Sequence, residues 1–288
     1  MKLETAIIIY SMINYLIISS LKIVGGLLLG LSSLMADGLH TFVDFITDII
    51  SIIGIKFSKK KPTKHHPFGY GKIEYLTNLY IGVILFLLGT FIIVHGLISK
   101  TVIPPISLLG VLLVALGLKL AAILTMHIVG EKIHSQLLIT STEESKTDLY
   151  SSIGVLFITI ILQFANKYEF LTYLNVIGTV LIGLYVIKTA IEIMAHNSMS
   201  LIGETIEDEE TINKINKYLK EFKDIEDTRI RLIKYGSYYK LELGLDVTDN
   251  MSLRRITILE NKVRKGIIRH RSLKVKYVSI YVTNKFEK

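Results

Sequence analysis

Four ionisable residues at helical spacing lie inside an apolar segment of the sequence. Asp37, His40, Asp44 and Asp48 occur in the run SLMADGLHTFVDFITDII, at offsets of three, four and four. In a helix these offsets place all four side chains on one face. The apolar segment, residues 31–57, is long enough to cross a bilayer, which takes about 20 residues. Ionised groups at membrane depth cost at least about 2.5 kcal/mol each, so they are expected to face a cavity or a partner.

The chemistry of this stripe favours a bound cation. Three carboxylates and an imidazole on one face repel each other unless a cation or protons neutralise them. The alternative is a structural polar seam, in which the groups only hydrogen-bond to neighbouring helices. The sequence has no cysteine, so a metal would have only nitrogen and oxygen ligands. The pattern therefore predicts a divalent-metal site, with Asp37 and Asp48 as the less certain ligands.

A second acidic pair begins another apolar segment, STEESKTDLYSSIGVLF. Glu144 and Asp148 are one helical turn apart and, together with His40 and Asp44, would supply four ligands to one ion. One imidazole and three carboxylates form a mixed site that accepts Zn²⁺, Fe²⁺, Mn²⁺, Co²⁺ or Cd²⁺. The carboxylates exceed the charge of a divalent ion, and imidazole ordinarily changes charge near neutral pH. Metal release can therefore be coupled to protonation.

Six apolar segments must position these residues. The chain has 288 residues, half of them hydrophobic, and its apolar runs fall at residues 6–29, 31–57, 73–98, 106–129, 145–165 and 171–195. The first run lacks a cleavage pattern and is interpreted as a retained span. The loop at residues 58–72, SKKKPTKHHPFGYGK, is densely basic, whereas residues 99–105 contain only Lys100. The positive-inside rule therefore places this loop and both termini in the cytoplasm of a multi-pass membrane protein.

The composition changes after the sixth segment. Residues 1–203 are predicted to form a six-helix transmembrane domain of all-α class, and residues 204–288 a cytoplasmic α+β domain. In the second part, residues 208–222 and 252–270 have helical periodicity, and residues 228–235, 238–247 and 274–282 alternate as strands do. The order αββαβ predicts a two-layer α+β domain, with Leu241, Leu243, Leu245 and Val247 on its buried face.

Three motifs resemble those of the cation diffusion facilitators, a family of proton-coupled exporters of divalent metals. They are ADGLHTFVD, HPFGYGKIEYL and the stretch Asp148-Leu-Tyr-Ser-Ser. The resemblance covers nearly the whole chain and implies six spans and a ferredoxin-like cytoplasmic domain that forms a homodimer. It implies that His40, Asp44, Glu144 and Asp148 form the transport site, although Glu144 stands where the family usually has His or Asp. Zn²⁺ comes first among the cargoes that it implies, followed by Fe²⁺ and Mn²⁺.

The resemblance also suggests two further sites. In the family, a lysine forms an ion pair, called the charge interlock, with an acidic residue near the linker to the soluble domain. Here this would pair Lys72 with Glu204 or Asp208. Some relatives bind metal in the cytosolic loop, where this chain keeps His65 and His66 but has Tyr70 at a place where a ligand often lies. The C-terminal domain is not expected to bind a transition metal tightly, because His270 is its only histidine.

The function expected from these features is efflux of a divalent transition metal by Me²⁺/H⁺ antiport across the cell membrane. The expected partners are metal ions, protons, membrane lipids and a second copy of the chain. Enzymatic activity, an organic cofactor and nucleic-acid binding are not expected. The net charge of +8 is explained by the basic cytoplasmic loops and the C-terminal domain. Two alternatives remain open: a passive metal-gated channel, and a non-transporting metal sensor or scaffold.

Overall fold

The structure is a computed structural model of the whole chain, and it describes residues 2–132, 136–236, 238–248 and 251–283. Within these ranges the side chains of residues 2–8, 130, 136–141, 143, 144, 147 and 271 are not described.

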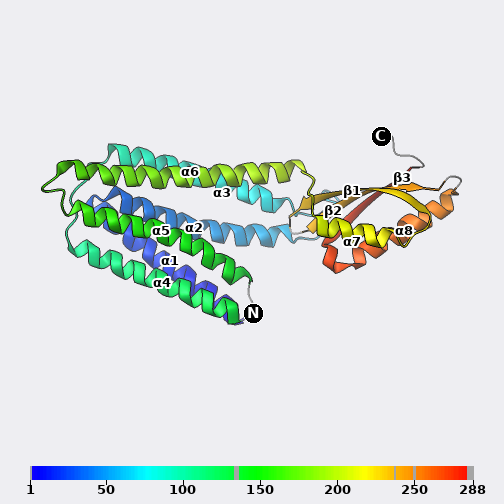
Figure 1. Cartoon of the computed structure of the whole chain (residues 1–288), viewed down its shortest axis with the longest axis horizontal. Coiled ribbons are helices and arrows are strands. Elements are labelled where there is room, and N and C mark those ends of the chain that lie inside the picture. Colours follow the sequence, from blue (N-terminus) through cyan, green and yellow to red (C-terminus); the bar gives the residue numbers. More distant parts are fainter. Residues whose placement is uncertain (1, 133–135, 237, 249–250, 284–288) are drawn as a thin grey trace. The chain divides into compact units, whose positions relative to one another are not determined.

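Six long helices make up the N-terminal part (Figure 1). Their bounds are α1 Lys2–Leu29, α2 Ser32–Ser58, α3 Ile73–Ile98, α4 Ser107–Lys132, α5 Gln136–Leu162 and α6 Tyr173–Ile202, the last preceded by the 3-10 turn η1, Glu169–Thr172. Among the described residues, five of these helices are long and apolar enough to span a membrane, and the apolar part of α5, Asp148–Leu162, is shorter. Since the polar half of α5 contains Glu144, the helix is less hydrophobic where the predicted site lies. The six-helix prediction is confirmed.

The break between α1 and α2 has a local cause. Gly30 has a φ of +65°, a left-handed conformation that favours glycine and commonly ends a helix. The amide of Leu31 then donates to the carbonyl of Gly26 at 3.0 Å, which satisfies one of the last carbonyls of α1. The chain therefore reverses direction within a few residues, and α2 begins directly after it.

The chain divides into two compact units, and their boundary differs from the predicted one at residue 203. One unit comprises residues 1–50 and 80–193, and the other comprises residues 51–79 and 194–288. In the first unit α2 takes part in two apolar clusters. Leu34 packs with residues of α4 and α5, including Leu112 and Val155, whereas Val43 packs with Leu85 of α3 and Val186 of α6. Helix α2, which carries Asp37, His40, Asp44 and Asp48, thus packs against α4 and α5 on the one hand and against α3 and α6 on the other.

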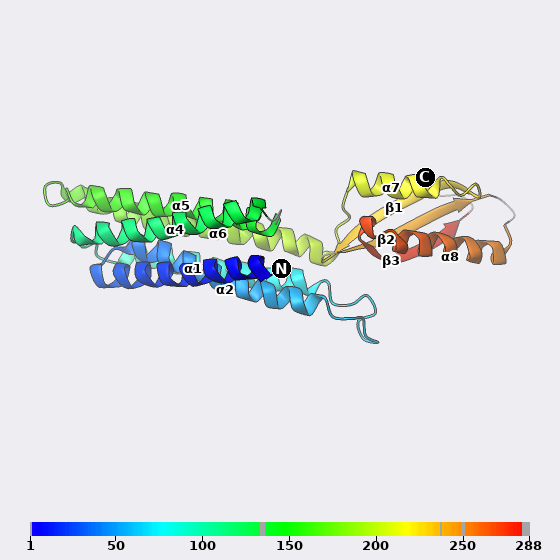
Figure 2. The same ribbon diagram turned by 90° about the horizontal axis from the view of Figure 1, so that it is seen from below.

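The second unit contains the α+β domain in the predicted order. Its elements are α7 Glu209–Leu219, β1 Ile225–Tyr235, β2 Tyr238–Val247, α8 Leu253–Arg269, the 3-10 turn η2 Arg271–Leu273 and β3 Val275–Thr283. The sheet order is β1-β2-β3, with β1 antiparallel and β3 parallel to β2. A parallel neighbour requires a crossover, which α8 supplies. Helix α7 packs on β1 and α8 on β3 (Figure 2).

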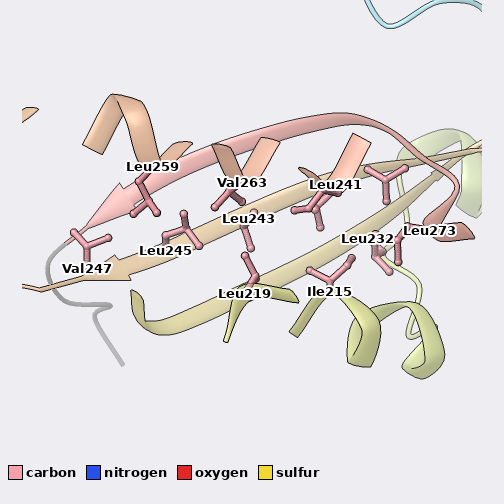
Figure 3. Packing of buried hydrophobic residues seen from close by; sticks show 12 residues of the cluster. Ile215, Leu219, Leu232, Leu241, Leu243, Leu245, Val247, Leu259, Val263 and Leu273 are labelled. Atoms are coloured by element: carbon pink, nitrogen blue, oxygen red, sulfur yellow. The ribbon is translucent and has the colours of Figure 1, made fainter. Parts of the chain in front are cut away.

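The core of this domain is apolar throughout. Figure 3 shows Ile215 and Leu219 of α7 and Leu259 and Val263 of α8 converging on the side chains of β2. The four residues predicted for the buried face of β2 are all buried, which confirms that prediction: Leu241, Leu243, Leu245 and Val247.

Candidate metal centre

Helices α2 and α5 bring three of the predicted ligands together. One donor atom from each of His40, Asp44 and Asp148 lies within 4.8 Å of the others. The Nδ1 of His40 is 3.5 Å from Oδ2 of Asp44, and its Nε2 is 3.7 Å from Oδ1 of Asp148. His40 is buried, and the two carboxylates are half-buried. One ion could contact all three groups after small side-chain movements.

The imidazole of His40 leaves a donor atom available. Its Nδ1 is buried and has no hydrogen-bond partner among the described residues. A buried polar atom without a partner is costly, so its presence calls for an explanation such as an ion. The ring also meets Tyr185 of α6 edge to face, with 6.2 Å between centroids. The ring thus lies beside two carboxylates, and its buried Nδ1 makes no hydrogen bond to a described residue.

Asp37 has a different role from the one predicted. Its Oδ2 accepts a hydrogen bond from Lys22 of α1 at 2.6 Å, and its Oδ1 accepts one from Ser151 of α5, also at 2.6 Å. The side chains of this ion pair are only 3% and 1% exposed. A Cβ on Gly38 would lie 2.8 Å from the Cβ of Lys22, so glycine at this position allows α1 to approach α2. Asp37 therefore belongs to a structural ion pair beside the cluster.

Lys119 of α4 is the second buried cation. Its Nζ lies 3.8 Å from Oδ2 of Asp148 and 3.4 Å from the hydroxyl of Ser152. The same hydroxyl accepts from Lys22 at 2.8 Å. Four helices thus contribute to one polar core, in which two lysines and two serines surround the carboxylates.

The sequence interpretation missed Lys22 and Lys119. Each is a single lysine inside an otherwise apolar run, IISSLKIVGG and LLVALGLKLAAIL. A charge at membrane depth marks a functional or paired position, and a lysine in an apolar run is such a signal. It would have identified both lysines, although not which carboxylate each one contacts.

Two other predicted ligands, Asp48 and His66, are not part of the cluster. Asp48 is exposed on α2, and the side chain of Glu144 lies outside the described residues. The ring of His66 stacks on Tyr70, with 4.6 Å between centroids. Within the described ranges, His40, Asp44 and Asp148 form the one group of three or more possible metal ligands. The loop site is therefore not assembled from the residues that the structure describes.

The structure does not bring Lys72 to either predicted carboxylate. Its ammonium donates to the carbonyl of Leu201 at 2.7 Å and lies 5.6 Å from the ring centroid of Tyr235. Glu204 is exposed. Lys72 thus holds the end of α6 through a backbone carbonyl.

Asp208 is the N-cap of α7 instead. Its carboxylate accepts from the backbone amide of Thr211 at 3.1 Å, from the Thr211 hydroxyl at 2.8 Å and from Tyr239 at 3.2 Å. The hydrogen bond from the Thr211 amide is the main reason that the pKa of Asp208 lies below its usual value. The role of this residue is therefore accounted for within the α+β domain.

The structure thus combines apolar helices long enough to span a membrane with a polar cluster of His40, Asp44 and Asp148. The family described as the cation efflux transmembrane domain matches residues 8–202. The chain therefore belongs to the cation efflux family, also called the cation diffusion facilitators, as its motifs indicated.

Relatives match over most of their length. An uncharacterised transporter of Methanocaldococcus jannaschii is 26% identical over 96% of this chain and 98% of its own. The manganese efflux system protein MneP of Bacillus subtilis strain 168 is 25% identical over 99% of this chain and 98% of its own. The manganese efflux system protein MneS of the same strain is 25% identical over 88% of this chain and 87% of its own. The protein is thus a member of a family of metal cation transporters.

Proposed function

We propose that this protein exports a divalent transition metal across the membrane by exchange for protons, with Mn²⁺ as its first candidate cargo. The observation that carries the proposal is the meeting of His40, Asp44 and Asp148 from two helices within 4.8 Å. The three groups offer one nitrogen and several oxygen donors at the depth of an apolar bundle. A binding site of this kind inside the membrane is what a carrier requires.

The donor set is the reason for placing Mn²⁺ ahead of Zn²⁺. Two carboxylates and one imidazole are mainly oxygen donors, and hard oxygen ligands suit Mn²⁺ better than they suit softer ions. Glu144, one turn before Asp148 in the sequence, would add a third carboxylate. Two relatives that match most of this chain are named for manganese efflux. Zn²⁺ and Fe²⁺ remain the next candidates.

Charge balance supports exchange for protons. Asp44 and Asp148 together offset the charge of one divalent ion. When the ion leaves, half-buried carboxylates close to each other repel, and protons relieve this repulsion. Proton binding and metal binding at one donor set therefore compete, which is the basis of an antiport cycle.

Flux measurements in proteoliposomes test this proposal. Purified protein would be assayed with Mn²⁺, Fe²⁺, Zn²⁺ and Co²⁺, with and without a pH gradient. Asp44→Ala and Asp148→Ala should each reduce Mn²⁺ flux more than about 100-fold. This exceeds the reduction of about 10- to 100-fold that is typical when a residue that only hydrogen-bonds to a metal ligand is lost. Asp48→Ala is the matched control, because it removes an exposed carboxylate from the same helix, and it should retain most of the flux.

The same assay separates the alternatives. A passive channel would conduct the metal down its own gradient with no response to the pH gradient. A sensor or scaffold would bind the metal and give no flux. Normal flux in Asp44→Ala and Asp148→Ala would contradict the assignment of the site.

The assembly and orientation complete the proposal. We expect both termini and residues 204–288 to lie in the cytoplasm of the cell, with the α+β domain joining two copies of the chain. Cysteine labelling at introduced positions and the mass of the detergent-solubilised protein are the respective checks.

A further inference from the structure

Lys119 is a fully buried cation that has no role in the transport cycle proposed above. It lies in the middle of α4, and its relative exposure is 0%. Burying an ammonium group in an apolar bundle is costly unless a carboxylate and hydrogen bonds compensate it. Its presence therefore requires a partner, and Asp148 of the candidate metal centre is the described carboxylate within 4 Å of it.

The two buried lysines are held very differently. Lys22 is engaged by Asp37 at 2.6 Å and by Ser152 at 2.8 Å, both within ordinary hydrogen-bond distance. Among the described residues, the side-chain contacts of Lys119 are longer, at 3.8 Å to Asp148 and 3.4 Å to Ser152. A charged pair with strong hydrogen bonds is normally shorter than these contacts. Lys22 is thus fixed, whereas Lys119 is attracted to Asp148 without being tightly bound to it.

Lys119 and a metal ion need the same carboxylate. Asp148 contacts His40 through Oδ1 and Lys119 through Oδ2. An ion held by His40, Asp44 and Asp148 would come close to the ammonium, and like charges in a medium of low dielectric repel strongly. The ammonium would then have to move away from Asp148, and the hydroxyl of Ser152, 3.4 Å from its Nζ, could still accept a hydrogen bond from it.

We infer that Lys119 is a built-in competitor for the metal: its ammonium neutralises Asp148 in the empty site and is displaced when the cargo binds. This inference rests on the proposed function, because it concerns the same site. The lysine weakens metal binding and speeds metal release, since it supplies Asp148 with a cation as the metal leaves. It acts through Asp148 as a positioning residue and does not itself coordinate the ion.

The test is the affinity of the full-length protein for Mn²⁺, measured by equilibrium binding and by flux. Lys119→Met keeps the length of the side chain and removes the charge. It should bind Mn²⁺ roughly 10- to 100-fold more tightly, the range by which groups behind metal ligands change affinity. Its KM and its maximal flux should both fall, because binding strengthens and release slows. Lys119→Arg should restore values near those of the wild type.

The controls keep the outcomes distinct. Lys188→Met removes a lysine that is 73% exposed on α6 and should change neither quantity. Lys119→Gln is the second variant if Lys119→Met does not fold, since an amide can still reach Ser152. Absence of Mn²⁺ binding and flux in the wild type would contradict the proposed function itself. Wild-type binding with unchanged or weaker affinity in the neutral variants would overturn only the role of Lys119, and would mean that the lysine is structural or is needed to bind the metal.

Discussion

The apolar core of the α+β domain and the polar core between α1, α2, α4 and α5 make different demands on their residues. In the domain, side chains such as Leu243 and Val263 are completely buried and need only fit one another. In the bundle, each buried charge must find a partner, and Lys22 with Asp37 is the clearest instance. When a buried apolar side chain is truncated, its neighbours can relax partly into the cavity. When one member of a buried ion pair is removed, the other charge stays buried without compensation.

The largest effect on stability is expected from Lys22→Met. It leaves Asp37 buried, with Ser151 as the remaining side-chain partner among the described residues, and breaking a buried pair in this way costs about 3–5 kcal/mol. The melting temperature of the detergent-solubilised protein should fall strongly. The double variant Lys22→Met, Asp37→Leu should recover most of the loss, because an apolar pair needs no compensation. If the single variant is as stable as the wild type, the ion pair does not hold α1 to α2.

Leu243→Ala is the corresponding change in the apolar core. Truncating a fully buried leucine typically costs about 2–5 kcal/mol, and the relative exposure of Leu243 is 0%. Hydrogen exchange of the full-length protein should show faster exchange in β1, β2 and β3, with α1, α2 and α4 unchanged. Ile258→Ala, at an exposed position of α8, is the control and should have little effect. Equal acceleration in the bundle would show that the two cores do not unfold independently.

The two cores also differ in how far the sequence predicted them. Period-two alternation in residues 238–247 identified the buried face of β2, because packing against α7 and α8 follows from hydrophobic pattern alone. Helical spacing placed His40 and Asp44 on one face, and the acidic pair Glu144 and Asp148 at the start of another apolar segment added Asp148 from a second helix. Which cation lies beside which carboxylate depends on helix packing, which one sequence does not encode locally. The ion pair of Asp37 and the contact of Lys119 with Asp148 were therefore missed.

Metal selectivity should respond to position 144. Glu144→His replaces an oxygen donor by a softer nitrogen donor, so preference should shift from Mn²⁺ towards Zn²⁺. We expect a change of about tenfold in the ratio of the two flux rates, the lower part of the range for groups that tune a metal site. Competition of the two ions in proteoliposomes measures this ratio. An unchanged ratio would exclude Glu144 from contact with the metal.

The smallest effect is expected at the N-cap of α7. The folded state lowers the pKa of Asp208, mainly through the amide of Thr211, so the ionised cap stabilises the fold above the ordinary carboxyl pKa of about 3.9. This stabilisation is lost as the pH falls through the lower pKa of the folded state. Asp208→Asn keeps a good cap and should remove this dependence on pH below about 4. Hydrogen exchange in α7 at pH 3 and pH 6 is the measurement, and an identical pH response in both proteins would contradict this role of Asp208.

The central claim is that His40, Asp44 and Asp148 hold the transported ion between α2 and α5. Anomalous diffraction from crystals of the full-length protein containing Mn²⁺ tests it most directly. We predict one strong Mn²⁺ peak in contact with all three side chains, with the Nζ of Lys119 farther from Asp148 than the 3.8 Å of the present structure. A transport-competent protein with its Mn²⁺ peak elsewhere in the bundle, and none at these three residues, would contradict the account.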